Sequence, residues 1–355
     1  MKRQLSIITS GLLLTSTLSF AADSIDEAFK TGTVSGDITL YGLSTDNKGG
    51  NVDTDAAYGT IGLAYETASY MGLSAKAGFR AGHEFGNSAT LGTDAVMTEA
   101  NIKYATDMFS VTAGRQAIDL EWIGDYNEAV VAEISAVQDT AITLAYVNQQ
   151  AEADEDTVNE FAEVTEDGLY VLDVKYTGLA GFEFNPYAYS APDVADYYGL
   201  KASYSSDMFG AIAQYVASSE DIGSNGSIGH VEVNGTLAGV STALGYIKTD
   251  DTAGVGSIAL YGDNITPFDN GDDNYLVDAR TTYGSLGYTI AGVELGVLYG
   301  ETDFAANSES SELNLTSSYS ITDSLSLGLL YVDYDLEGSS ASDYKEYSAT
   351  LAYTF

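Results

Sequence analysis

The feature that most constrains this chain is a period-two alternation of apolar and polar side chains, repeated in segments of about ten residues. In one segment Leu73, Ala75, Ala77 and Phe79 share a phase, and Lys76 lies between them. Because successive side chains of a β-strand point to opposite faces, each segment predicts a strand with one apolar and one polar face. About eighteen such segments predict a chain built almost entirely of antiparallel strands.

Only one stretch of the chain is continuously apolar. It runs from Leu5 to Phe20, follows Lys2 and Arg3, and ends at the small residue Ala21. This pattern predicts a secretory signal cleaved after Ala21. A membrane anchor is the alternative, but the run is shorter than the roughly 20 residues of a spanning helix, and the acidic Asp23 follows. A mature chain that crosses a membrane must then do so as a closed barrel, since only helices and barrels satisfy their backbone hydrogen bonds in lipid.

We therefore predict a signal peptide at residues 1–21, a short periplasmic segment at 22–31 and a β-barrel porin domain at 32–355. Ser24-Ile25-Asp26-Glu27 has the pattern of a capping box, which predicts one short helical turn in the second segment. The expected fold is an all-β transmembrane antiparallel barrel of about eighteen strands, with about sixteen as the lower bound.

The connections between these segments alternate in length. Thr106-Asp107 and Ala238-Gly239 are short, whereas residues 44–56, 150–167 and 250–274 are long and acidic. Short periplasmic turns on one rim and long extracellular loops on the other are typical of outer-membrane barrels.

Composition favours the same fold. The 355 residues include 37 Gly and 27 Tyr but only 3 Pro, as expected for many strands and aromatic belts. Twelve tyrosines fall in the apolar phase near strand ends and predict two aromatic girdles, although tyrosine is also a good strand residue in general. They are Tyr65, Tyr104, Tyr176, Tyr204, Tyr288, Tyr319 and Tyr353 on descending strands, and Tyr146, Tyr215, Tyr246, Tyr299 and Tyr331 on ascending ones.

Charge and cysteine content exclude several classes of function. The formal net charge of −39 repels nucleic acid and attracts cations, so we expect no nucleic-acid partner. Without any Cys, the chain has neither disulfides nor thiolate metal sites.

Three stretches carry a resemblance to a known family, and the C-terminus resembles a signal of outer-membrane barrels in general. Residues 114–131, which contain Arg115, Glu121 and Trp122, resemble the third-loop region of the Opr-type, Campylobacter-type major outer-membrane porins. Residues 24–37 resemble the mature start of these porins, and residues 278–283 resemble one of their late strands. The terminal Tyr353-Thr354-Phe355 is similar to the signal that outer-membrane barrels present to the barrel assembly machinery, so Tyr353 and Phe355 are the expected assembly signal.

The resemblance implies an eighteen-stranded barrel, a third loop folded into the pore, a homotrimer, and passage of ions and small hydrophilic solutes. It also implies the outer membrane of a Gram-negative bacterium after Sec-type export, with outer-membrane lipid and lipopolysaccharide as neighbours.

The basic residues are expected on the pore wall, because Lys or Arg on the lipid face costs roughly 2 to 4 kcal/mol at mid-depth. All but Arg115 are assigned to the inward phase; for Arg115 either a bulge resets the phase or the strand has already left the membrane. The predicted basic wall consists of Lys76, Arg80, Lys103, Arg115, Lys175, Lys201 and Arg280.

The loop after Arg115 supplies the expected acidic side of a constriction. Its members are Asp119, Glu121, Asp125 and Glu128. Opposite charges across a narrow passage would create a transverse field that polar solutes tolerate better than apolar ones. The alternative is that these groups are wall ion pairs that merely stabilise the barrel.

Calcium is a weak candidate ligand. Asp119, Glu121 and Asp125 offer the hard oxygen ligands that Ca²⁺ prefers, and so does the acidic run between Glu152 and Asp167. No fixed calcium spacing is present, and a solvated, self-repelling loop is the favoured interpretation of the run. We expect no resident cofactor.

The sequence gives no sign of an enzyme. The two histidines, His83 and His230, would have to join a serine in a hydrolase of the outer-membrane phospholipase kind, and Ser227 and Ser241 lie near His230. No recognisable motif connects them, so a lumen-wall histidine is the favoured interpretation.

The sequence-based hypothesis is therefore a passive, water-filled diffusion pore with modest cation preference. One alternative is a plugged structural or adhesive outer-membrane barrel with Ca²⁺-binding surface loops. Another is a soluble, calcium-loaded β-sandwich, against which the outward apolar phases and the aromatic C-terminus stand.

Overall fold

The fold is seen in a computed structural model, which describes residues 22–86, 91–262, 264–304, 308–338 and 342–355. The predicted signal peptide at 1–21 lies outside the described residues. In chain order the elements are α1 (Ile25–Lys30), β1 (Thr33–Asn47), β2 (Thr54–Glu66), β3 (Leu73–Glu84), β4 (Ala95–Ala105), β5 (Phe109–Ala117), β6 (Tyr126–Val137), β7 (Thr140–Ala151), β8 (Ala162–Glu163), β9 (Leu169–Tyr176), β10 (Phe182–Ala191), β11 (Ala195–Ser205), β12 (Phe209–Glu220), β13 (Ser227–Leu237), β14 (Val240–Thr249), η1 (Gly256–Leu260), η2 (Asp273–Tyr275), β15 (Arg280–Ile290), β16 (Val293–Phe304), β17 (Ser308–Ser320), β18 (Leu325–Leu336) and β19 (Tyr344–Thr354).

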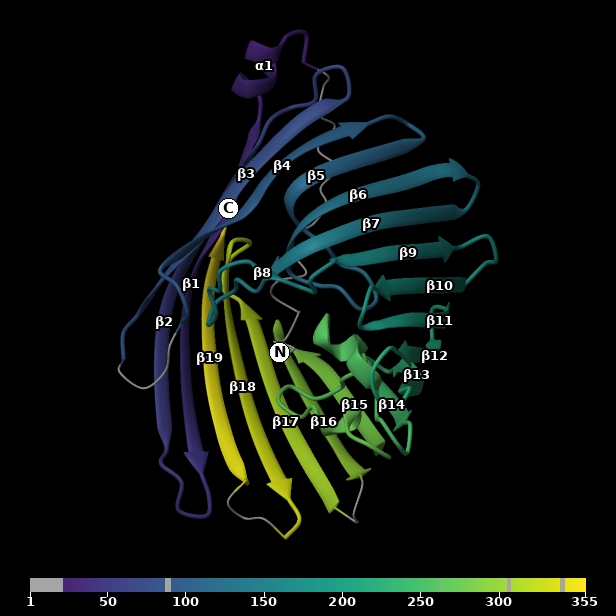
Figure 1. Cartoon of the computed structure of the whole chain (residues 1–355). Coiled ribbons are helices and arrows are strands. Elements are labelled where there is room, and N and C mark those ends of the chain that lie inside the picture. Colours follow the sequence, from purple (N-terminus) through teal and green to yellow (C-terminus); the bar gives the residue numbers. More distant parts are fainter. Residues whose placement is uncertain (1–21, 87–90, 263, 305–307, 339–341) are drawn as a thin grey trace.

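The strands form one closed antiparallel barrel (Figure 1). Apart from β8, each strand pairs with its neighbours in the chain, and β1 closes the ring by pairing with β19 from Asp37↔Thr354 to Asn47↔Tyr344. The two-residue β8 pairs only with β7, so 18 strands make up the ring in the described part of the chain. The predicted fold class is confirmed.

The start of the described chain and the short turns follow local sequence rules. Ser24 caps α1, because its hydroxyl accepts the amide hydrogen of Glu27 at 3.2 Å, and the Glu27 carboxylate accepts from the amide of Asp23 at 2.9 Å. In the turn between β13 and β14, Ala238 and Gly239 have φ values of 54° and 82°. Positive φ at both central residues is the geometry that favours a tight hairpin.

The alternation separates an apolar outside from a polar inside. On β16, Leu295 and Tyr299 are 45% and 47% exposed, whereas Thr302 between outward residues is buried against Thr281 of β15. In the described residues no helix is long and apolar enough to cross a membrane.

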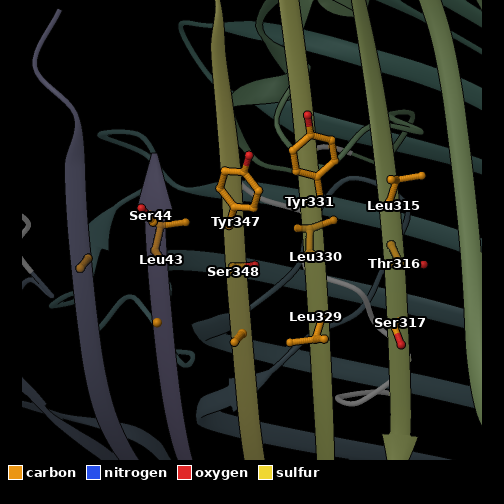
Figure 2. Close-up of a pocket in the computed structure, with 13 residues that line it drawn as sticks. Leu43, Ser44, Leu315, Thr316, Ser317, Leu329, Leu330, Tyr331, Tyr347 and Ser348 are labelled. Atoms are coloured by element: carbon orange, nitrogen blue, oxygen red, sulfur yellow. The ribbon is translucent and has the colours of Figure 1, made fainter. Parts of the chain in front are cut away.

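Most of the predicted girdle tyrosines lie exposed on the outer surface, among them Tyr104, Tyr215 and Tyr353. Neighbouring strands place aromatic rings together: the Tyr331 and Tyr347 ring centroids are 5.1 Å apart. Figure 2 shows these two rings side by side on β18 and β19, above Leu329 and beside a shallow hollow of the outer surface.

In the described part of the chain at least three connections fold into the barrel, not one. Residues 118–125, between β5 and β6, pack with residues of the β14–β15 connection in one buried apolar cluster around Trp122 and Ile258. Residues 152–168, between β7 and β9, bury Ala153 and Val158 in a second cluster with Tyr41 and Tyr58. The sequence predicted the β7–β9 and β14–β15 connections to be extracellular loops. That prediction is wrong for their buried apolar residues, such as Val158 and Ile258.

The β14–β15 connection crosses the lumen, and its short helical turns lie within the ring of strands (Figure 1). The Glu312 carboxylate on β17 accepts the amide hydrogens of Asp269 and Asn270 at 3.0 and 3.1 Å. Tyr334 on β18 donates to Asp273 at 2.6 Å. The connection that the sequence placed at residues 250–274 is longer than expected, because η2 occupies Asp273–Tyr275 and β15 begins only at Arg280.

Candidate functional site

The loop at residues 118–125 reaches from β5 to the part of the wall formed by β10, β11 and β12. It closes on itself through two backbone hydrogen bonds, Ile118 to Asp125 at 3.0 Å and Leu120 to Ile123 at 2.9 Å. At its tip the Trp122 indole donates to the Tyr187 hydroxyl on β10 at 3.1 Å. Trp122 is 1% exposed, so the tip is held by both burial and hydrogen bonds.

Glu121 has side-chain partners from three elements of the barrel. Its carboxylate lies 3.1 and 3.3 Å from the ammonium group of Lys201 on β11 and accepts from the side-chain amide of Gln214 on β12 at 3.0 Å. Asn264 of the β14–β15 connection also donates to it. The negative charge of Glu121 is therefore balanced, and the residue joins two inward loops to the wall.

The other predicted constriction acids do not converge with Glu121. Asp119 is exposed, and Asp125 occupies a turn position with φ of 59°. Glu128 on β6 pairs with Arg115 at 3.3 Å. Glu121 and Glu128 are thus paired with different basic residues, Lys201 and Arg115, which contradicts a single constriction shared by all four carboxylates.

Arg115 does not belong to the basic wall. It follows Gly114, whose φ is 116°, and its guanidinium lies 4.2 Å from the ring centroid of Phe161. A register shift interrupts β6 directly after its partner Glu128. The arginine therefore sits at an irregular strand end, covered by the β7–β9 connection.

Three predicted basic residues do share one inner wall, and each is paired. Arg80 binds Asp37 through two hydrogen bonds of 2.7 and 3.1 Å, and Lys76 lies 2.9 Å from Glu99. Lys103 is more open, 3.9 Å from Glu133. This is the ion-pair arrangement that the sequence left as an alternative.

Of the remaining basic residues, Lys175 shares the inward face of β9 with the buried Asp173. Arg280 is exposed, pairs with Asp278 at 2.8 Å, and alternates with the buried Thr281. It therefore points away from the lumen, and its predicted wall position is wrong. It lies at the rim end of β15, where water rather than hydrocarbon surrounds the charge.

Three acids of the run between Glu152 and Asp167, which the sequence favoured as a solvated loop, fold inward: Asp154, Glu155 and Asp156. Asp154 accepts the amide hydrogens of Asp156 and Thr157 at 3.0 and 2.8 Å, which forms a tight turn. Burial and the neighbouring carboxylates raise the pKa of Asp154 to about 8. Burial also raises the pKa of Glu155, which lies close enough to interact with Arg80. The sequence signal that could have predicted this inward fold is Val158, an apolar residue within the acidic run whose side chain is buried.

The two histidines sit in different surroundings. His83 packs edge-on against Phe85 with ring centroids 5.3 Å apart. The Nε2 atom of His230 is 2.9 Å from the Tyr283 hydroxyl, which donates to Glu232 at 2.6 Å. Within the described ranges no group of three or more His, Cys, Asp or Glu side chains could hold a metal ion.

Comparisons with known proteins agree with this geometry. Residues 28–209, just over half of the chain, match a family model described as "Putative outer membrane protein". No curated protein matches the sequence.

Solved structures share the fold at low sequence identity. OpdO of Pseudomonas aeruginosa has 13% identity and a TM-score of 0.81, covering 93% of this chain and 98% of that one. OccK8 (OprE) of the same organism has 12% identity and a TM-score of 0.78, covering 92% and 99%. OccAB4 of Acinetobacter baumannii has 15% identity and a TM-score of 0.77, covering 91% and 98%. At these identities the likeness concerns the fold alone, and the narrower Campylobacter-type resemblance stays a prediction.

Proposed function

The chain belongs to this outer-membrane protein family, and from that premise we propose that it forms a passive, water-filled channel for ions and small hydrophilic solutes. The proposed mechanism is size exclusion by the inward loops combined with an electrostatic filter, without a catalytic step or a resident cofactor.

One observation carries this proposal. Ionised pairs such as Arg80–Asp37 and Lys76–Glu99 line the inside of a closed ring whose outside is apolar. The Lys76 side chain is 23% exposed toward the interior, so it is not sealed in a dry core. Because ionised groups are expensive to desolvate, a wall of this kind favours a lumen that contains water.

We propose a modest cation preference. Lys201 is balanced by Glu121, and Lys76 and Arg80 are balanced by their own carboxylates, whereas Glu155 and Asp156 add acidic groups beside the passage. Asp154 adds its charge as the pH rises through its pKa of about 8. With a Debye length of about 8 Å at physiological salt, only charges near the passage act on a permeating ion. The acids of the β7–β9 connection are thus stronger candidates for the filter than Glu121.

The test is electrical recording on purified, refolded protein in a planar bilayer. A tenfold salt gradient should give a stable conductance and a reversal potential of the sign that favours K⁺ over Cl⁻. A folded barrel without conductance would support the alternative of a plugged structural or adhesive barrel. A reversal potential that favours Cl⁻ would leave a channel but reject the cation preference.

The partners are also proposed. The C-terminal strand closes the ring, with Phe355 and Gly36 exchanging two backbone hydrogen bonds of 3.0 Å, which supports recognition of Tyr353 and Phe355 by the barrel assembly machinery before closure. The outward tyrosines and leucines suit outer-membrane lipid and lipopolysaccharide. We retain a homotrimer, which native mass spectrometry in mild detergent would test against a monomer.

A further inference from the structure

A chamber of about 370 Å³ opens on the lumen beneath the β14–β15 connection. Its walls come from strands β11 to β16, and residues 264–267 of the connection form its roof. The apolar side chains of Ile247, Ile265 and Leu298 line one part, and the polar groups of Gln214, Glu232 and Tyr283 line another. The lining is more polar than apolar, because His230 and Asn264 also contribute to it. A concave space in which convergent polar groups lie beside apolar side chains can hold a small molecule, and this volume is at the small end of the usual range.

The charges around the chamber are unequal. Lys201 also lines it, but its ammonium group is paired with Glu121 at 3.1 Å. The donors that the structure shows for the Glu232 carboxylate are both neutral. They are the Tyr283 hydroxyl at 2.6 Å and the Asn234 side-chain amide at 2.9 Å. No ion pair among the described residues includes Glu232.

The half-buried Glu232 carboxylate therefore has no ion-pair partner among the described residues, and it shares the chamber with the apolar side chains of Ile247 and Leu298. His230 also lines the chamber and is linked to Glu232 through the Tyr283 hydroxyl. A permeating K⁺ ion would interact only with the carboxylate. A solute that carries a primary ammonium group on a compact apolar body would interact with both the carboxylate and the apolar side chains, because the ammonium donates to Glu232 while the body replaces water at Ile247 and Leu298.

We propose that this chamber is a transient binding site for primary organic ammonium ions with a small apolar body, on the periplasmic side of the inward loops. The inference rests on the proposed water-filled channel, through which the solute would reach the site. Binding must stay weak, since conduction requires that a solute leave as readily as it enters.

The experiment measures block of the K⁺ current by 2-phenylethylammonium. Phenylacetate has the same body with the opposite charge, and ethylammonium has the charge with almost no body. We expect concentration-dependent block by 2-phenylethylammonium, at least roughly tenfold weaker block by ethylammonium, and none by phenylacetate. Equal block by all three probes would overturn the proposal.

Two variants locate the site. Glu232→Gln keeps an acceptor for Tyr283 but removes the charge, and it should weaken the block at least roughly tenfold. Its matched control is Glu294→Gln on β16, an inward carboxylate that accepts from Ser318 at 3.1 Å and is not part of the chamber, which should leave the block unchanged. Undiminished block in Glu232→Gln would overturn the assignment.

Tyr283→Phe provides a second variant in case Glu232→Gln folds poorly. It removes a neutral donor but leaves the carboxylate, so block should be retained or strengthened. Loss of block in Tyr283→Phe together with retention in Glu232→Gln would reject a role for the charge.

Calorimetric titration of the refolded protein in detergent with 2-phenylethylammonium separates this inference from the channel itself. Binding that depends on Glu232 without any K⁺ current would contradict the channel and support the chamber. A normal K⁺ current without binding or block would overturn the chamber alone.

Discussion

Replacing Lys201 by methionine should release the tip of the 118–125 loop from the part of the wall formed by β10, β11 and β12. Lys201 supplies the only cation within ion-pair distance of Glu121 in the described residues, and the Glu121 side chain is 7% exposed. Methionine keeps most of the side-chain volume, so the change isolates the charge.

The magnitude follows from the burial of the pair. Removing one partner of a buried ion pair costs about 3 to 5 kcal/mol, and the lower end applies because the Lys201 side chain is 26% exposed. A cost of about 3 kcal/mol shifts the balance between docked and undocked loop by roughly a hundredfold. Glu121→Gln combined with Lys201→Met removes both charges and should recover much of this loss.

Trp122 makes the loop observable, because it is the only tryptophan in the chain and is 1% exposed. In the wild type its emission should resist quenching by acrylamide; in Lys201→Met quenching should rise several-fold, and in the double variant it should return toward the wild type. Lys103→Met, at the open 3.9 Å pair, is the control and should leave quenching unchanged. Wild-type quenching in Lys201→Met would refute the reasoning, and so would equal quenching in the single and double variants.

Further predictions concern pH, selectivity and assembly. Because the pKa of Asp154 is raised to about 8, its carboxyl is mostly neutral at pH 7 and gains charge as the pH rises. Cation preference in reversal-potential measurements should therefore grow between pH 7 and pH 9 in the wild type but not in Asp154→Asn; a flat wild-type profile would reject this. The same shift predicts that the inward position of the β7–β9 connection loses stability as the pH rises from 3.8 to about 8, because over this range Asp154 is protonated when buried but ionised when exposed to water; above pH 8 this group causes no further change. Arg80→Met removes the partner of Asp37 and should increase K⁺ preference, so an unchanged reversal potential would place the filter elsewhere. Replacing Tyr353 and Phe355 by alanine should lower the yield of heat-modifiable barrel in cells, whereas wild-type yield would exclude them as the assembly signal.

Local patterns were enough to predict the wall of the barrel. A strand that faces lipid on one side and water on the other must alternate, so segments such as 73–79 revealed both their element and their outer face. The Ser24 cap and the Ala238-Gly239 turn depend only on neighbouring residues, and they too followed from the sequence.

The interior was harder to predict, because its contacts join residues far apart in the chain. Glu121 and Lys201 are 80 positions apart, and Glu312 meets Asp269 across 43. No periodicity indicates that an acidic loop will find such partners. Arg280 was misassigned for a different reason: the lipid-face penalty applies at mid-depth and does not reach the strand end where this residue lies.

The central claim is that water fills the inside of this ring and lipid covers its outside. The chain has no cysteine, so single cysteines can be placed along β16 without background. Reaction with a charged, water-soluble thiol reagent should be fast for Glu294→Cys and Gly296→Cys, and slow for Leu295→Cys and Val297→Cys in the same membranes. Equal rates at all four positions, or the opposite order, would contradict the account.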